Sequence, residues 1–86
     1  MEKEWDSGGL VADVVVLVYD HHKHGLVHQL MHIQHDHGQA IISSQHVHLD
    51  HDSCMEMVTV RGEAAEVRQL VATLRSVKGL KHTALL

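Results

Sequence analysis

Apolar and polar residues alternate along the chain in a way that predicts six elements of secondary structure. Strands are predicted where valine-rich or alternating segments lie between turn residues, and helices where apolar residues recur every three or four positions. The predicted order is a strand at 10–19, a helix at 21–35, strands at 40–49 and 54–61, a helix that opens at Gly62 and is capped by Gly79, and a short strand at 80–86.

This order of strands and helices predicts an α+β domain. It matches the ferredoxin-like βαββαβ pattern, in which an antiparallel four-stranded sheet carries both helices on one face. The nearly continuous valine run predicts that the strand at 10–19 is buried on both faces. An exposed sheet face in so small a domain is expected to pack against a second copy of the chain, which predicts a homo-oligomer.

The length and charge of the chain limit its function. The 86 residues allow one small domain, predicted at 9–86, while residues 1–8 have no hydrophobic period and are interpreted as a flexible linker remnant. The formal net charge of −4 has the wrong sign for a domain that binds nucleic acid on its own. No apolar run is long enough to span a membrane and the N-terminus does not resemble a signal peptide, so we expect a cytoplasmic protein.

Histidine is the residue type that changes this picture most. The chain has 11 histidines and one cysteine, Cys54. His46 and His48 are two residues apart in a predicted strand, so both imidazoles project from one face, and Cys54 begins the next strand across the turn. Imidazole together with thiolate predicts a transition-metal site. Glu56 shares the strand face of Cys54 and is either an ordinary solvated acid or a carboxylate that accepts an N–H of a ligand imidazole.

Three donors leave a coordination position open. His35 is the favoured fourth ligand and His51 the competing one, and spacing does not decide whether His35 belongs to the same chain or to a neighbour. Three histidines and a thiolate suit Zn(II) in a tetrahedron, or Ni(II) or Cu(II) in a plane. The polar face of the first helix also carries a histidine stripe, for which weak extra metal binding is an alternative to a solvated face: His21, His24, His28 and His32.

Two motifs and the strand that follows them resemble a known family. They are Q-H-D-H at 34–37, H-V-H-L-D-H-D-S-C-M-E at 46–56, and the hydrophobic strand that ends in Arg61 and Gly62. With residues 9–86 as a whole, they resemble the C-terminal regulatory domain of the NikR family of nickel-responsive repressors, whose fold is ACT-like.

The resemblance implies a square-planar nickel site. Its ligands would be His46, His48 and Cys54 of one subunit and His35 of another. The metal would order the end of the first helix and bias how the dimers are held relative to each other. Gly38 stands where several family members carry a further histidine, so no auxiliary site is expected there.

The resemblance also implies a homotetramer that is not an enzyme. It would reach DNA only through an N-terminal ribbon-helix-helix domain, which the first nine residues cannot form. The alternative is a zinc-stabilised structural or small-molecule-binding ACT-like module. Metal storage and catalysis fit less well, because histidines are spread over the whole chain and four protein ligands leave no room for a substrate.

Overall fold

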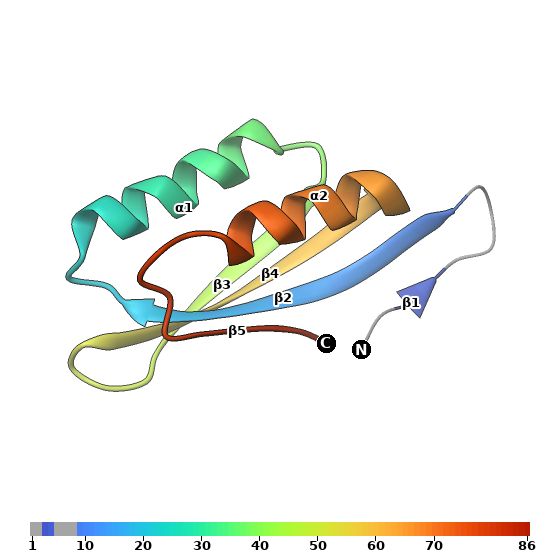
Figure 1. Ribbon diagram of the computed structural model, residues 1–86. Coiled ribbons are helices and arrows are strands. Elements are labelled where there is room, and N and C mark those ends of the chain that lie inside the picture. Colours follow the sequence, from blue (N-terminus) through green and yellow to red (C-terminus); the bar gives the residue numbers. More distant parts are fainter. Residues whose placement is uncertain (1–2, 5–8) are drawn as a thin grey trace.

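The computed structural model describes residues 3–4 and 9–86, which form one antiparallel sheet and two helices (Figure 1). The strands and helices are, in chain order, β1 (Lys3–Glu4), β2 (Leu10–Asp20), α1 (His24–Asp36), β3 (Ile41–His48), β4 (Ser53–Glu63), α2 (Ala64–Arg75) and β5 (His82–Leu85). The sheet order is β1-β2-β4-β3, and β5 pairs with β2 beside residues 15–18.

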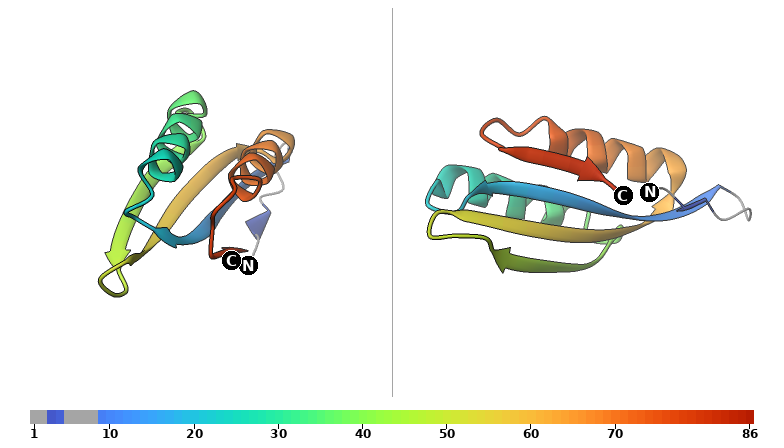
Figure 2. Two further views of the ribbon diagram at one scale, coloured as in Figure 1. Left: turned by 60° about the vertical axis from the view of Figure 1, so that its left-hand side comes forward. Right: turned by 90° about the horizontal axis from the view of Figure 1, so that it is seen from below.

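The predicted βαββαβ order is confirmed by the run from β2 to β5, and both helices lie on one face of the sheet (Figure 2). The strand β1 adds to this pattern. It falls within the predicted linker, and its residues Lys3 and Glu4 pair with Ala12 and Val11 of β2. The other residues of the predicted linker, 1–2 and 5–8, lie outside the part of the chain that the structure describes.

The core lies between the helices and the sheet. In β2 every second residue is buried against the helices, as at Val11, Val15 and Leu17, while the residues between them are only half-buried. The prediction that this strand is buried on both faces is therefore wrong, because no element of the described chain covers the second face. Leu30 of α1 and Leu70 of α2 are among the fully buried side chains that meet β2 and β4.

Both helices are shorter than predicted, because local hydrogen bonds form turns at one end of each. The helix expected from His21 begins at His24, because Asp20 accepts the N–H groups of His22 and Lys23 and so forms a turn there. The second helix ends at Arg75, well before Gly79. At that end the Ser76 hydroxyl donates to the carbonyl of Thr73 at 2.7 Å, and Gly79 lies in the following turn with φ 100°.

A β-bulge sets the register between β3 and β4. Ile41 pairs with Val60 and Ser43 with Thr59, so Ile42 is one extra residue in β3. As a result Ile41 and His46 lie on the same face of the sheet, the face that carries the helices.

Candidate metal centre

The β3–β4 hairpin brings the predicted donors to one face of the sheet. His48 lies directly opposite Cys54, and His46 lies directly opposite Glu56. Cross-strand partners in an antiparallel sheet share a face, and so do residues two apart on one strand. Cys54 and Glu56, on the central strand β4, are only 2% and 3% exposed, whereas the His46 side chain on the edge strand β3 is 54% exposed.

The carboxylate of Glu56 has three polar side chains as neighbours on this face. It accepts a hydrogen bond from the Tyr19 hydroxyl at 3.0 Å and another from Gln34 Nε2 at 2.8 Å. His46 Nε2 lies 3.4 Å from Glu56 Oε1. The structure thus rules out the solvated-acid interpretation of Glu56 and places its carboxylate beside the imidazole of His46. Whether that imidazole binds a metal remains a prediction.

Tyr19 is held in its protonated form by this arrangement. Burial, followed by the nearby Glu56 carboxylate, raises the pKa of the phenol far above its ordinary value. The hydroxyl therefore keeps its proton and donates a hydrogen bond to Glu56.

The remaining donors face other partners. The His48 ring lies 5.2 Å from the ring of His21, and the Cys54 thiol lies 3.8 Å from the carbonyl oxygen of Met55. The ligand atoms of His46, His48 and Cys54 are not all within 4.8 Å of one another in the described chain. The three side chains nevertheless share one face, since His48 and Cys54 are cross-strand neighbours, whose Cβ atoms are typically about 5 Å apart, and His46 lies two residues from His48. This placement is compatible with a shared metal ion once the side chains change rotamer.

His35 stands in the last turn of α1 and is exposed. It lines a cavity of about 510 Å³ together with Gln34, His46 and Glu56. Gln34 lies in the segment 34–37, in which the sequence predicts the fourth ligand, but its hydrogen bond to Glu56 was not predicted. His35 and His46 thus line the same cavity, between the end of α1 and β3. Within the described residues, however, His35 does not form a three-ligand cluster with the other predicted ligands.

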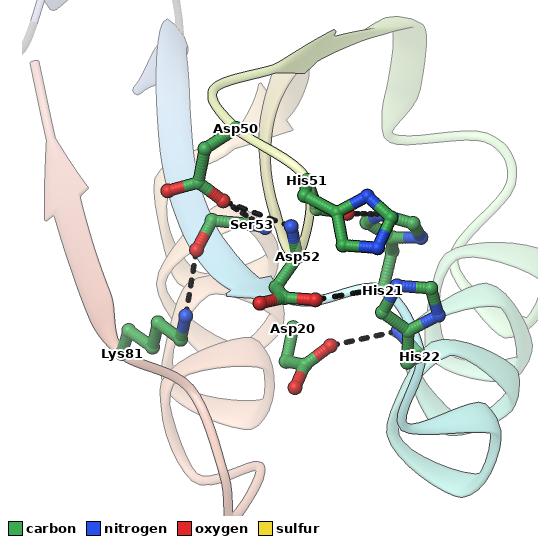
Figure 3. A network of polar contacts seen from close by, with 8 residues as sticks. All are labelled: Asp20, His21, His22, Asp50, His51, Asp52, Ser53 and Lys81. Carbon is green, nitrogen blue, oxygen red and sulfur yellow. Dashed lines mark hydrogen bonds and ion pairs between the residues drawn. The ribbon is translucent and has the colours of Figure 1, made fainter.

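A different cluster lies at the opposite end of α1 (Figure 3). Within residues 3–4 and 9–86, one group of three metal-ligating side chains has its ligand atoms all within 4.8 Å: His22, His51 and Asp52. His51 therefore lies with these residues and not beside Cys54. The sequence signals were D-H-H at 20–22 and D-H-D at 50–52, but only the fold brings the two segments together.

The fold and the donors define a class of protein, namely a domain of ACT-like fold with imidazole and thiolate groups on one hairpin. Residues 12–86 match the family described as "NikR C terminal nickel binding domain". The chain belongs to this family.

Relatives support the same conclusion over nearly the whole chain. A protein of Chlorobium phaeobacteroides is 52% identical over 85 residues, which cover 99% of this chain and 63% of that protein. A protein of Solibacter usitatus is 49% identical over 83 residues, 95% of this chain and 60% of that one. Both carry the name "Putative nickel-responsive regulator", which denotes a regulator and not an enzyme, as expected. The chain thus spans less than two thirds of the length of these relatives.

Solved structures with low sequence identity share the fold. An uncharacterised protein from Thermotoga maritima has a TM-score of 0.75 at 11% identity, over 90% of this chain and 98% of its own. The ACT domain of a GTP pyrophosphokinase from Chlorobium tepidum has a TM-score of 0.64 at 19% identity, over 87% and 96%. The predicted ACT-like fold is confirmed. Neither helix of the described chain has the length and apolar character needed to cross a membrane.

Proposed function

We propose that this chain is the nickel-sensing and oligomerisation domain of a nickel-responsive transcriptional regulator. The proposal rests on membership of the NikR C-terminal family and on relatives named as nickel-responsive regulators. The observation that carries it is the β3–β4 register, which puts two imidazoles and one thiol on a single face of one hairpin.

In the proposed site, His46, His48 and Cys54 of one subunit and His35 of another hold Ni(II) in a square plane. Three nitrogens and one thiolate suit a planar nickel ion. The exposure of His35 in the last turn of α1 supports its role as the ligand from a second subunit, because another chain can approach it there. Glu56 would fix the orientation of the His46 ring from behind.

The assembly we propose is a homotetramer in the cytoplasm. The half-buried outer face of the sheet supports association, because the described chain leaves Val14, Val16 and Val18 without a covering layer. DNA binding would require a further domain, as the greater length of the relatives suggests. Nickel would favour one arrangement of the subunits by binding it more tightly than the other.

Complementation between two inactive variants tests the shared site. His35→Ala and Cys54→Ser should each lose the thiolate-to-nickel absorption band of a planar Ni(II) site, because each removes one ligand. Mixed and reassembled, the two variants should regain part of that band. The His35→Ala chain still has His46, His48 and Cys54, and these three ligands can bind nickel together with His35 of the Cys54→Ser chain.

Two controls test whether the recovered band comes from a site shared between subunits. His28→Ala removes an exposed imidazole from the same helix and should leave the band unchanged. Recovery fails if His35 acts within its own chain, since no chain in the mixture then holds all four ligands. A full band in His35→Ala alone would remove this residue from the site. Native mass determination gives the number of subunits.

A further inference from the structure

We propose that His22, His51 and Asp52 form an accessory site for a divalent transition metal that prefers nitrogen and oxygen ligands, with Zn(II) as its best match. The proposed nickel site shares none of these residues. His22 follows the end of β2, whereas His51 and Asp52 belong to the turn between β3 and β4 (Figure 3).

The spacing of the three side chains suits a metal ion better than a hydrogen-bonded cluster. His22 Nε2 lies 3.5 Å from Asp52 Oδ1, and the rings of His22 and His51 lie 5.7 Å apart. Two ligands of a tetrahedral Zn(II), with bonds of about 2.0–2.1 Å, are separated by about 3.3 Å. Small rotations of exposed side chains therefore bring all three ligand atoms onto one ion, with a fourth position left for water.

Backbone hydrogen bonds hold the two segments against each other. The His21 N–H donates to the Asp52 carbonyl at 3.1 Å, and His21 Nε2 lies 3.0 Å from the His51 carbonyl oxygen, to which it can donate. These two contacts join the end of β2 to the turn. The ligands of the proposed site thus come from segments that are about 30 residues apart in sequence but fixed next to each other.

Aspartate side chains fix each segment internally. Asp20 Oδ1 accepts the His22 N–H at 2.9 Å, and Asp50 Oδ1 accepts the N–H groups of Asp52 at 2.9 Å and Ser53 at 2.7 Å. Such Asx turns order the backbone before a ligand arrives, which lowers the entropy cost of binding.

The local charge also favours a cation. The carboxylates of Asp20, Asp50 and Asp52 all lie in this region and contribute formal negative charge (Figure 3). Lys23 and Lys81 are nearby opposing charges. The Lys81 ammonium donates to the Ser53 hydroxyl at 2.6 Å, on the far side of the turn from His22 and His51 (Figure 3).

The ligand set separates this site from the proposed nickel site. It lacks a thiolate and has two imidazoles and one carboxylate, which suits Zn(II) in a tetrahedron. The two sites adjoin, because the His21 ring lies 4.2 Å from the His22 ring and 5.2 Å from that of His48. Two divalent ions so placed repel each other, and the accessory site is measured most cleanly when the hairpin donors have been removed.

The test is a calorimetric titration of Zn(II) into a chain that carries His46→Ala and Cys54→Ser. We expect one ion per chain. Adding His51→Asn or Asp52→Asn should lower the affinity by at least about tenfold, since loss of an outer-shell partner alone costs about 10–100-fold. All these side chains except Cys54 are exposed, and thermal unfolding of each variant shows whether the fold is intact.

His32→Asn is the matched control. His32 Nε2 lies 3.4 Å from Asp36 Oδ2 on α1, a similarly exposed histidine–aspartate pair to which the described residues add no third ligand. Its substitution should leave Zn(II) binding unchanged. The proposal is overturned if the background chain binds no Zn(II), if His51→Asn and Asp52→Asn leave the affinity unchanged, or if His32→Asn lowers it as much as they do. In the otherwise unsubstituted chain, His51→Asn should keep the nickel absorption band, which distinguishes failure of this site from failure of the proposed nickel site.

Discussion

Replacing Glu56 by glutamine should separate the stability of the domain from its affinity for nickel. The carboxylate accepts hydrogen bonds from Tyr19 and Gln34 and lies 3.4 Å from His46 Nε2. Glutamine keeps the shape and one acceptor oxygen, but it has no charge and brings two N–H groups of its own. One of the two buried hydrogen bonds is therefore lost.

The expected loss of stability follows from that count. A hydrogen bond to a charged group contributes about 1.5–3 kcal/mol, so Glu56→Gln should lower the free energy of unfolding by about that amount. For a domain of this size each kcal/mol corresponds to about 4–8 °C in Tm. Nickel affinity should fall by about 10–100-fold, the usual cost of removing the partner of a ligand imidazole.

Tyr19→Phe is the control that decides the interpretation. It removes one hydrogen bond to Glu56 and should cost a similar amount of stability, yet it leaves the carboxylate beside His46. Chemical denaturation gives the stability of each variant, and competition titration with Ni(II) gives the affinity. If both substitutions lower nickel affinity equally, or neither does, Glu56 does not act through His46 and the reasoning is refuted.

Three further predictions concern the rest of the domain. Asp13 is 6% exposed, its Oδ1 accepts the Val14 N–H at 2.8 Å, and its Oδ2 has no hydrogen-bond partner within the described residues. Asp13→Val removes the unpaired buried oxygen, which costs about 1–3 kcal/mol, and also the bond to Val14, which contributes about 1 kcal/mol, so a net stabilisation of up to about 2 kcal/mol is expected in chemical denaturation; a loss of stability would contradict this. The N–H groups of Ser53 and Asp52 lower the pKa of Asp50 below its usual 3.8, so this carboxylate stabilises the fold at higher pH and stops doing so as the pH falls through its lowered value. Thermal unfolding of Asp50→Ala should accordingly depend less on pH between about pH 5 and pH 2.5 than that of the unsubstituted chain, and equal slopes would count against it. Removing metal with a chelator should leave the far-ultraviolet circular dichroism unchanged, because the core lies between helices and sheet; unfolding would instead favour the zinc-stabilised alternative.

Hydrophobic periodicity was enough to predict the order of the elements but not their ends. The apolar face of α1 extends the pattern back to His21, yet the side chain and carbonyl of Asp20 form a turn that delays the helix to His24. The valine run of β2 was likewise predicted to be buried on both faces, although the two helices of the described chain cover only one. Local hydrogen bonds and the number of layers are not visible in a hydrophobic pattern.

The candidate sites divide in the same way. His46, His48 and Cys54 could be placed together because strand alternation and one short turn fix their relative positions. The cluster of His22 with the turn residues could not be predicted, since nothing in the sequence states that the end of β2 touches that turn. Whether His35 reaches a neighbouring chain depends on an assembly that a single chain does not contain.

The extra residue in β3 has a consequence for how the domain tolerates insertions and deletions. Ile41 and the two histidines can face the helices together only because Ile42 shifts the alternation by one position. Shortening β3 by one residue at this point would force a choice. Either the isoleucine leaves the hydrophobic interior, or both imidazoles turn to the opposite side of the sheet from Cys54. Ile42 itself is 52% exposed and is not a proposed ligand, so a length change there would act through the alternation of the strand.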